Sequence, residues 1–406
     1  MLPTFKKPIS IASLNEWDFV MVKKNKGQEL WKTAIQIIPG GNGLLSKRPD
    51  RYAKDIWPSY FSKAKGCMIW DLDGNSYIDM TQNGIGTTLF GYADDEINSA
   101  VLAAVTAGVN TTLNAPEEVE LAKELLKLNP DMGSVKFARG GGEAMSIAVR
   151  IARAHAKKEK IAFSGYHGWH DWYLAANLSS GENLDGHLLP GLVPDGVPYG
   201  LNGTSVPFKY NDVDDFIKTM DNNSNVGVII IEGARYALPS SKFLNAITEV
   251  AAKKNLVVIM DEITSGFRNS NSGVYRSLEF KPDIVVYGKA LGNGFAISAV
   301  VGKHEVMTAA EDTFISSTMW TERVGFAAGL ATLKKIQQDQ IYTHLIRIGK
   351  MIGDGWLSLA KKHDLNLSIT EFSPLIGFRW HYGDENNAIT TLFTQLMLRK
   401  GYLAAA

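Results

Sequence analysis

The chain has 406 residues, and its 42 lysines and arginines balance its 42 aspartates and glutamates, which gives a formal net charge of zero. This balance argues against a nucleic-acid partner, because polyanion-binding surfaces are strongly basic. The 45% hydrophobic and 21% charged residues are typical of a folded domain, and the single cysteine, Cys67, excludes an internal disulfide framework and a cysteine-built zinc cluster.

The N-terminal residues Met1 to Trp17 alternate polar and apolar side chains and lack the apolar run of a signal peptide. No stretch reaches the roughly 18 uninterrupted apolar residues that a membrane span needs. We therefore expect a soluble, cytoplasmic protein that does not enter a membrane.

The first sixty residues are irregular, and Pro39 to Gly43 reads as a loop. Trp70 to Asp79 then predicts a hairpin of two half-apolar strands joined at Asp73-Gly74. A helix is expected from Pro116, a residue suited to a first helical turn, and a second helix from Gly142 to Lys157.

Short apolar runs then alternate with helical segments. They predict strands at Lys160–Ser164, Val226–Ile231, Leu256–Met260, Ile284–Tyr287 and Ile297–Val301. Runs that are apolar on both faces fit a mostly parallel sheet with helices on each side. This alternation predicts an α/β class of fold.

Beyond Glu322 the pattern predicts two helices, to about Ile336 and over Tyr342–His363, then a hairpin within Leu367–Tyr382 and a helix over Ala388–Arg399. We expect three parts: an N-terminal segment over residues 1–80, a large α/β domain over 81–315, and a small α+β domain over 316–406. Because the chain stops at Ala406 just after a helix, we expect the last domain to be incomplete.

The sequence motifs that would indicate nucleotide or metal binding are incomplete. Gly84-Ile85-Gly86 lacks the third glycine of a dinucleotide-binding turn, and no Gly-Lys-Ser/Thr sequence occurs. His167 and His170 are close enough in sequence to bind a metal, but the spacing alone is a weak signal. We expect no metal.

Two residues at predicted strand ends are candidates for chemistry. Asp261 follows the strand ending at Met260, on the side where open α/β sheets bind their ligands, although a solvated loop acid has the same pattern. Lys289 follows the strand ending at Tyr287 and has apolar neighbours, which suits a lysine of lowered pKa that forms a Schiff base. Taken alone, a surface lysine at a strand end is the commoner case.

Two further segments fit the same chemistry. Gly140-Gly141-Gly142 enters a helix, where free N–H groups and the helix dipole favour a phosphate. Tyr166 follows the strand Lys160–Ser164 and is suited to stacking on a planar ring. A phosphate cradle, a stacking aromatic, a carboxylate and a Schiff-base lysine together predict a site for pyridoxal phosphate (PLP).

The chain resembles the class III PLP-dependent aminotransferases of fold type I, and most closely the glutamate-1-semialdehyde aminomutase branch. Asp261-Glu262-Ile263-Thr264-Ser265-Gly266-Phe267-Arg268 is similar to the family's Asp-Glu-Val-x-x-Gly-Phe-Arg stretch, and Gly288-Lys289-Ala290-Leu291-Gly292-Asn293-Gly294 to its lysine motif. The resemblance implies a large domain with a mostly parallel, seven-stranded type of sheet and a smaller C-terminal domain.

The resemblance also implies roles for single residues. Lys289 would form the internal aldimine and move protons, and Asp261 would pair with the pyridine nitrogen. Ile263 and Tyr166 would cover the two faces of the ring, and Gly141 and Gly142 would hold the phosphate.

Three further positions follow from the same resemblance. Glu232 matches a glutamate beside the cofactor, and Thr318 matches a threonine that reaches the phosphate of the neighbouring subunit. Arg48 lies near the arginine that holds the substrate carboxylate in the aminomutase, with Lys47 the nearer match in register.

This sequence departs from the family pattern at three places. Gly142 stands where a threonine or serine is usual, and Gly233 replaces the proline after the glutamate. Trp320-Thr321-Glu322-Arg323 replaces a Ser-Gly-Asn-Pro-like stretch. We expect a homodimer with shared active sites that moves an amino group from an amino-acid donor to a carbonyl acceptor. Intramolecular amino transfer, decarboxylation and racemisation remain alternatives, as does a non-catalytic protein of the same fold.

Overall fold

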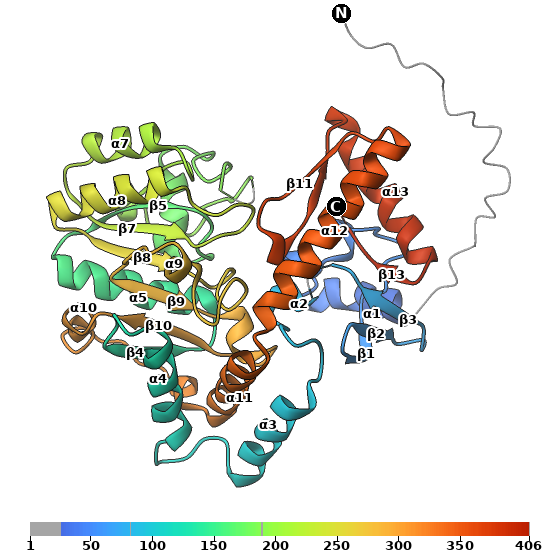
Figure 1. Cartoon of the computed structure of the whole chain (residues 1–406), viewed down its shortest axis with the longest axis horizontal. Helices are drawn as coiled ribbons and strands as arrows, with labels where there is room; N and C mark the ends of the chain where they lie inside the picture. The colour runs from blue at the N-terminus through green and yellow to red at the C-terminus, as the bar shows by residue number, and fades with distance from the viewer. Residues whose placement is uncertain (1–25, 82, 188–189, 406) are drawn as a thin grey trace, which may run out of the picture. The chain divides into compact units, whose positions relative to one another are not determined.

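A computed structural model describes residues 26–81, 83–187 and 190–405, and it divides into two compact units (Figure 1). The first unit comprises the described residues up to Ala64 together with Met68–Asp79 and Thr390–Ala405. The second comprises Lys65–Cys67 and the described part of Met80–Ile389. The segment Met1 to Trp17, considered above for a signal peptide, lies outside the described residues, and the three-part division expected from the sequence stays a prediction.

The first unit contains a small sheet with the strand order β1-β2-β3-β13. Asp71 holds the hairpin between β2 and β3, since its Oδ1 accepts the N–H groups of Asp73 and Asn75, each at 2.9 Å. The hairpin expected at Trp70–Asp79 is therefore confirmed. The elements of this unit are α1 (Lys26–Ile37), β1 (Phe61–Lys65), β2 (Met68–Asp71), β3 (Ser76–Asp79), β13 (Tyr402–Leu403) and most of α13 (Asn386–Arg399).

The second unit is built on a seven-stranded sheet within the described residues, in the order β4-β10-β9-β8-β7-β5-β6. The strands from β9 to β6 are parallel, and β10 is antiparallel to both of its neighbours, β4 and β9. Their bounds are β4 (Ser134–Ala138), β5 (Lys160–Ser164), β6 (Ser205–Pro207), β7 (Val226–Glu232), β8 (Val257–Asp261), β9 (Ile284–Tyr287) and β10 (Ser298–Gly302).

Successive strand residues face opposite sides of this sheet, so each strand contributes to two cores. On β8, for example, Val258 and Met260 pack into one core and Val257 and Ile259 into the other. The first core includes α4 (Pro116–Leu128), α7 (Val213–Asn222), α8 (Ser241–Lys254) and α11 (Arg323–Asp339). The second includes α5 (Gly141–Ala156), α6 (Asp171–Leu174) and α10 (His304–Met307).

The mostly parallel sheet with helices on both faces confirms the expected α/β fold. The sequence did not indicate β4, which contains Lys136, or β6, which has three residues and ends at Pro207. A short run broken by a charge or a proline has no strand periodicity of its own, and only pairing with β10 and β5 makes these segments extended.

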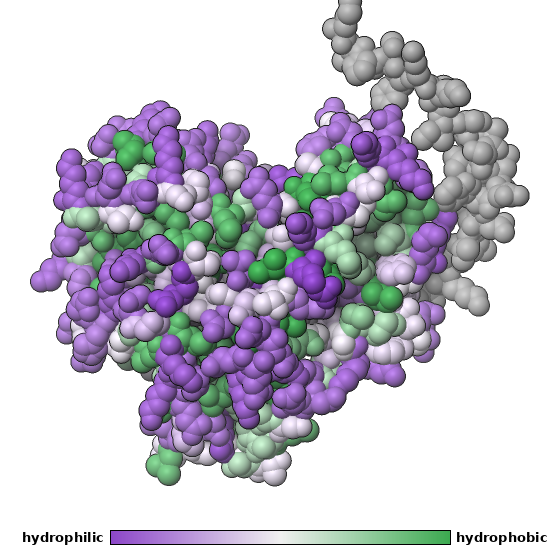
Figure 2. All heavy atoms as spheres, in the orientation of Figure 1, coloured by the Kyte–Doolittle hydropathy of each residue, from purple (hydrophilic) through white to green (hydrophobic). Residues whose placement is uncertain are grey.

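The C-terminal part of the second unit contains the expected helices and hairpin, namely α11, α12 (Ile341–His363), β11 (Leu367–Ile369) and β12 (Phe378–Trp380). The remaining helices are α2 (Asn83–Gly86), α3 (Asp95–Ala107) and α9 (Val274–Ser277). Hydrophilic side chains cover much of the face seen in Figure 2, with apolar residues scattered among them. Among the described residues, no helix combines the length and the hydropathy required to cross a membrane.

Candidate active site

The carboxyl ends of four parallel strands meet at one edge of the large sheet. Glu232 and Asp261 are the last residues of β7 and β8 and are paired in register. Ser164 ends β5 opposite Ile231, and Lys289 follows β9 by two residues. This edge is where open α/β sheets bind ligands, and it brings together Asp261, Glu232, Lys289 and the segment that carries Tyr166.

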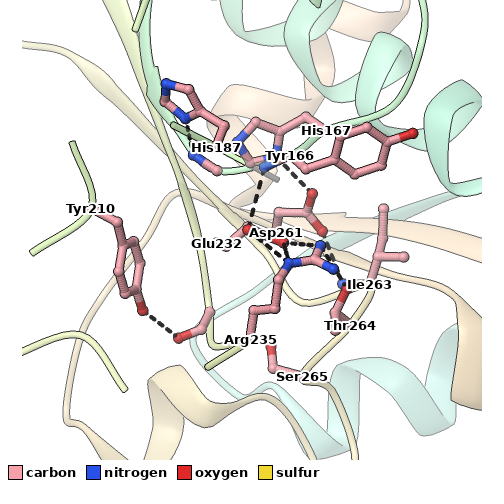
Figure 3. Close-up of polar contacts among 12 residues, drawn as sticks. Tyr166, His167, His187, Tyr210, Glu232, Arg235, Asp261, Ile263, Thr264 and Ser265 are labelled. Atoms are coloured by element: carbon pink, nitrogen blue, oxygen red, sulfur yellow. Dashed lines mark hydrogen bonds and ion pairs between the residues drawn. The ribbon is translucent and has the colours of Figure 1, made fainter. Parts of the chain in front are cut away.

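Asp261 is buried and held by an imidazole that the sequence analysis considered only for a metal. His167 Nδ1 lies 2.7 Å from Oδ2 of Asp261 (Figure 3). His167 Nε2 lies 3.2 Å from the carbonyl oxygen of Ser164. The other carboxylate oxygen, Oδ1, accepts the N–H of Ile263 at 2.9 Å. Both ring nitrogens thus face oxygen atoms, which fixes the orientation of the imidazole beside the carboxylate.

Lys289 is held by a hydroxyl group on the neighbouring loop. Its Nζ donates to Oγ1 of Thr264 at 2.8 Å. Burial, followed by the charge of Arg235, lowers the pKa of Lys289 from 10.5 to about 8. The backbone of Lys289 has a φ of +31°, which is uncommon for a residue with a side chain and occurs often at functional sites.

Glu232 forms an ion pair with a cation that the sequence analysis did not single out. The Nε of Arg235 donates to Oε1 of Glu232 at 3.1 Å, and its guanidinium carbon lies 6.0 Å from the centre of the Tyr166 ring (Figure 3). Arg235 Nη2 also lies 3.4 Å from Oγ1 of Thr264, the partner of Lys289. Glu232 accepts the N–H of Tyr166 at 3.3 Å, so the carboxylate joins the Tyr166 segment to this network.

The glycine turn, Gly140 to Gly142, lies against Ile263. A Cβ on Gly141 would lie 3.0 Å from Cδ1 of Ile263, the residue after Glu262 in the Asp261 motif. Glu143 closes the turn because its Oε2 accepts the N–H groups of Gly140 at 2.8 Å and Arg139 at 3.2 Å. The first N–H groups of α5 therefore lie beside Ile263, and the absence of side chains on Gly140, Gly141 and Gly142 leaves the backbone of this turn bare for an anion.

A strained turn borders Lys289 on another side. Residues Asn83 to Gly86 all have positive φ angles, including Ile85 at +62°, which is unusual for a β-branched residue. A Cβ on Gly86 would lie 3.8 Å from Cδ of Lys289, and Arg268 Nη2 donates to the carbonyl oxygen of Gly86. The Gly84-Ile85-Gly86 sequence, which fails as a nucleotide turn, thus lies near the candidate lysine.

Arg48 and Thr318 are the two remaining site residues predicted from the sequence. Arg48 belongs to the first unit, where its Nη2 pairs with Oδ2 of Asp50 at 2.7 Å. Thr318 is exposed at the start of the 3-10 turn Thr318–Thr321, and Arg139 Nε binds the carbonyl oxygen of the adjacent Met319 at 2.8 Å. Within the part of the chain that the structure describes, no group of three or more His, Cys, Asp and Glu side chains could hold a metal ion.

The arrangement matches the needs of an aldehyde cofactor that carries a phosphate and a basic ring nitrogen. Lys289 supplies an amine whose lowered pKa favours the nucleophilic neutral form. The buried Asp261 supplies a carboxyl group that is held in place, and the glycine turn at the start of α5 suits an anion. The residues present therefore fit PLP.

Comparisons with known proteins agree with this fit. Residues 51–396 match the model of the family described as aminotransferase class-III. The chain is 33% identical to a 3-aminobutyryl-CoA aminotransferase of Cloacimonas acidaminovorans, over 82% of this chain and 78% of that protein. It is 31% identical to a glutamate-1-semialdehyde 2,1-aminomutase of Campylobacter hominis, over 92% of this chain and 85% of that protein.

The fold also matches that of solved structures. An omega-transaminase from Sphaerobacter thermophilus superposes with a TM-score of 0.81 at 23% identity, over 97% of this chain and 92% of the other. The resemblance stated from the sequence, the fold and the PLP cofactor are confirmed. This chain belongs to the class-III aminotransferase family and is a PLP-dependent enzyme.

Proposed function

We propose that this enzyme is an aminotransferase that moves an amino group from an amino-acid donor to a carbonyl acceptor. The observation that supports this most is the meeting of Lys289, with its pKa lowered to about 8, and the buried Asp261–His167 pair at one sheet edge. When bound, PLP supplies an electron-withdrawing ring that makes a bond at the amino-bearing carbon labile.

In this proposal the chain's residues divide the work of holding the cofactor. Asp261 would pair with the pyridine nitrogen, and His167 keeps that carboxylate oriented. Ile263 and Tyr166 cover the two ring faces, and Gly141 and Gly142 hold the phosphate. Glu232 lies beside the ring, where its pairing with Arg235 holds the carboxylate in place.

Lys289 is the proposed acid and base of the reaction. Its neutral amine takes a proton from the amino-bearing carbon of the donor and returns a proton to the acceptor side. Thr264 supports this role, because its hydroxyl lies 2.8 Å from Nζ and restricts where the amine points. A pKa of about 8 leaves both protonation states of the amine accessible near neutral pH.

We further propose a homodimer in which Thr318 reaches the phosphate held by the partner chain. Large apolar side chains flank this segment at high exposure, with Phe314 at 84% and Met319 at 54%. Exposed apolar side chains of this size are consistent with a surface that a partner chain covers. We also propose a cytoplasmic location, because the single cysteine, Cys67, is free and exposed, as is common in reducing compartments. The role of Arg48 in binding the substrate carboxylate stays a prediction.

Intramolecular amino transfer is the second candidate, because relatives named as 2,1-aminomutases reach 31% identity. Decarboxylation and racemisation on the same fold remain further alternatives.

The deciding experiment supplies holoenzyme with single amino donors and no acceptor. An aminotransferase releases one equivalent of the oxo product per site and then stops until an acceptor is added. An aminomutase converts its substrate without external acceptor, and a decarboxylase releases carbon dioxide. Turnover without added acceptor would therefore overturn the proposal, and Lys289→Ala serves as the inactive control.

A further inference from the structure

The imidazole of His170 occupies the space beside Gly142, at the N-terminus of α5. A Cβ on Gly142 would lie 2.8 Å from Cε1 and 2.9 Å from Nδ1 of His170. A Cβ on Gly168 would lie 3.1 Å from the Cα of Gly142. The loop after β5 can thus approach the turn this closely because both positions are glycine, and the ring takes the place of a side chain at residue 142.

The inward-facing nitrogen of this ring has no partner in the described chain. Nδ1 of His170 is buried and makes no hydrogen bond to any described residue. Trp169 stacks on the ring with centroids 4.5 Å apart and an interplanar angle of 25°, which restricts its orientation. A buried polar atom without a partner is costly and uncommon, so its place beside an anion cradle points to a bound acceptor.

The charges around the ring are consistent with an anion. Burial lowers the pKa of His170, and the carboxylates of Glu143 and Asp171 oppose this effect. The free N–H groups and dipole of α5 attract negative charge to the same place. An anion bound there would favour the ring with a proton on Nδ1, because that N–H would point toward the negative charge.

We propose that Nδ1–H of His170 donates a hydrogen bond to the phosphate of PLP and replaces the hydroxyl that Gly142 lacks. The inference rests on the cofactor assignment and not on the proposed amino transfer. It assigns His170 as a phosphate-binding residue whose ligand is a phosphate monoester dianion. Because binding is measured without turnover, the proposal survives even if the enzyme proves to be a mutase or decarboxylase.

The test compares PLP with pyridoxal, which lacks the phosphate, in binding to apoenzyme. The measured quantity is the Kd for pyridoxal divided by the Kd for PLP. This ratio isolates the contribution of the phosphate to binding. His170→Phe keeps the ring volume and the stacking on Trp169 but removes the donor. We expect this variant to lower the ratio about 10- to 100-fold, as for a lost hydrogen bond to a charged group. His155→Phe, at an exposed position on α5, should leave the ratio unchanged.

A second pair of variants tests whether imidazole and hydroxyl are interchangeable. Gly142→Ser alone should weaken PLP binding, because its Cβ would collide with the ring. In the His170→Ala background, the serine at position 142 fits into the space that the ring vacates. Its hydroxyl should restore most of the decrease in the ratio of dissociation constants. Gly142→Ala in that background fills the space without a hydroxyl and should restore none.

The outcomes separate a phosphate contact from a structural role. An unchanged ratio in His170→Phe overturns the proposal, as does an equal loss of affinity for PLP and pyridoxal. Circular dichroism and thermal melting of each apoenzyme check the fold. If His170→Phe proves unfolded, the ³¹P resonance of PLP bound to wild-type and His170→Gln protein decides the question, and identical chemical shifts over the pH range would contradict it.

Discussion

His167 Nδ1 and Asp261 Oδ2 lie 2.7 Å apart in a buried pair, although 94 residues separate them in the chain. The second ring nitrogen faces the carbonyl oxygen of Ser164, so the imidazole is fixed at both ends. A carboxylate held in this way keeps its orientation at the carboxyl end of β8.

We expect His167→Gln to retain PLP but to lower kcat by roughly 10- to 100-fold, the cost of losing a hydrogen bond to a charged group. The reason is that the Asp261 carboxylate would lose its imidazole partner while the cofactor's other contacts remain. Steady-state kinetics with a saturating donor, together with the PLP content of the purified variant, measures both parts. The exposed His155→Gln is the control, and wild-type kcat in His167→Gln would contradict the role.

Lys289 should react as an amine of pKa about 8 in the apoenzyme. Its neutral fraction rises as pH passes through that value, so reductive methylation by formaldehyde should reach half of its maximal rate near pH 8. Mass spectrometry of peptides follows Lys289 and the exposed Lys242 in the same samples, and Lys242 reports the reagent's own pH dependence. A half-maximal rate of Lys289 methylation above pH 10 would contradict the lowered pKa.

Glu262 should make the protein less stable as pH rises. Burial raises the pKa of Glu262 from 4.5 to about 8, so the native state binds more protons than the unfolded state between these values. The contribution of Glu262 to the free energy of unfolding is fully present below about pH 4.5. It falls by up to about 1.4 kcal/mol per pH unit until the pH reaches the pKa of Glu262 in the folded protein.

The matched variant is Glu262→Gln, which keeps an acceptor for the N–H of Tyr275 and a polar group for Ser265. Thermal melting of the two holoenzymes should give similar Tm values near pH 5 and a higher Tm for Glu262→Gln at pH 8.5. A Tm difference that does not change with pH would show that Glu262 is ionised throughout.

Arg139 should stabilise the segment around Thr318. Its side chain donates to the carbonyl oxygens of Met319, Trp320 and Glu322. We expect Arg139→Met to lower the free energy of unfolding by about 2–4 kcal/mol, because three carbonyl groups lose their donor and Glu322 loses its ion pair. Urea unfolding measures this loss, with Arg276→Met as the control for an arginine in an exposed ion pair. Equal effects of the two variants would argue against the anchoring role.

The shared-site proposal predicts complementation between two inactive variants. Lys289→Ala and Thr318→Trp are mixed and allowed to exchange subunits. If Thr318 serves the partner's site, each mixed dimer contains one site with both defects and one with neither, and about a quarter of wild-type activity should return. If Thr318 serves its own chain, every site keeps a defect and the mixture stays inactive. Each variant incubated alone is the control.

The positions of Asp261 and Lys289 could be predicted from the sequence because each follows a continuous apolar run. Such a run marks a strand of a parallel sheet, and the end of the strand marks the ligand-binding edge. The helices from Pro116, Glu322 and Tyr342 were predictable for the same reason, since local periodicity and end signals determine them.

The partners of these residues could not be predicted, because they depend on which strands become neighbours. His167, Thr264 and Arg235 follow three different strands, and only the order β5-β7-β8-β9 brings them to Asp261 and Lys289. The contact between Gly142 and His170 likewise requires α5 and the loop after β5 to pack together. Local sequence pattern thus determined which residues lie at strand ends, whereas long-range backbone pairing decided which side chains meet, because hydrogen-bonded register between distant strands has no signature in either strand alone.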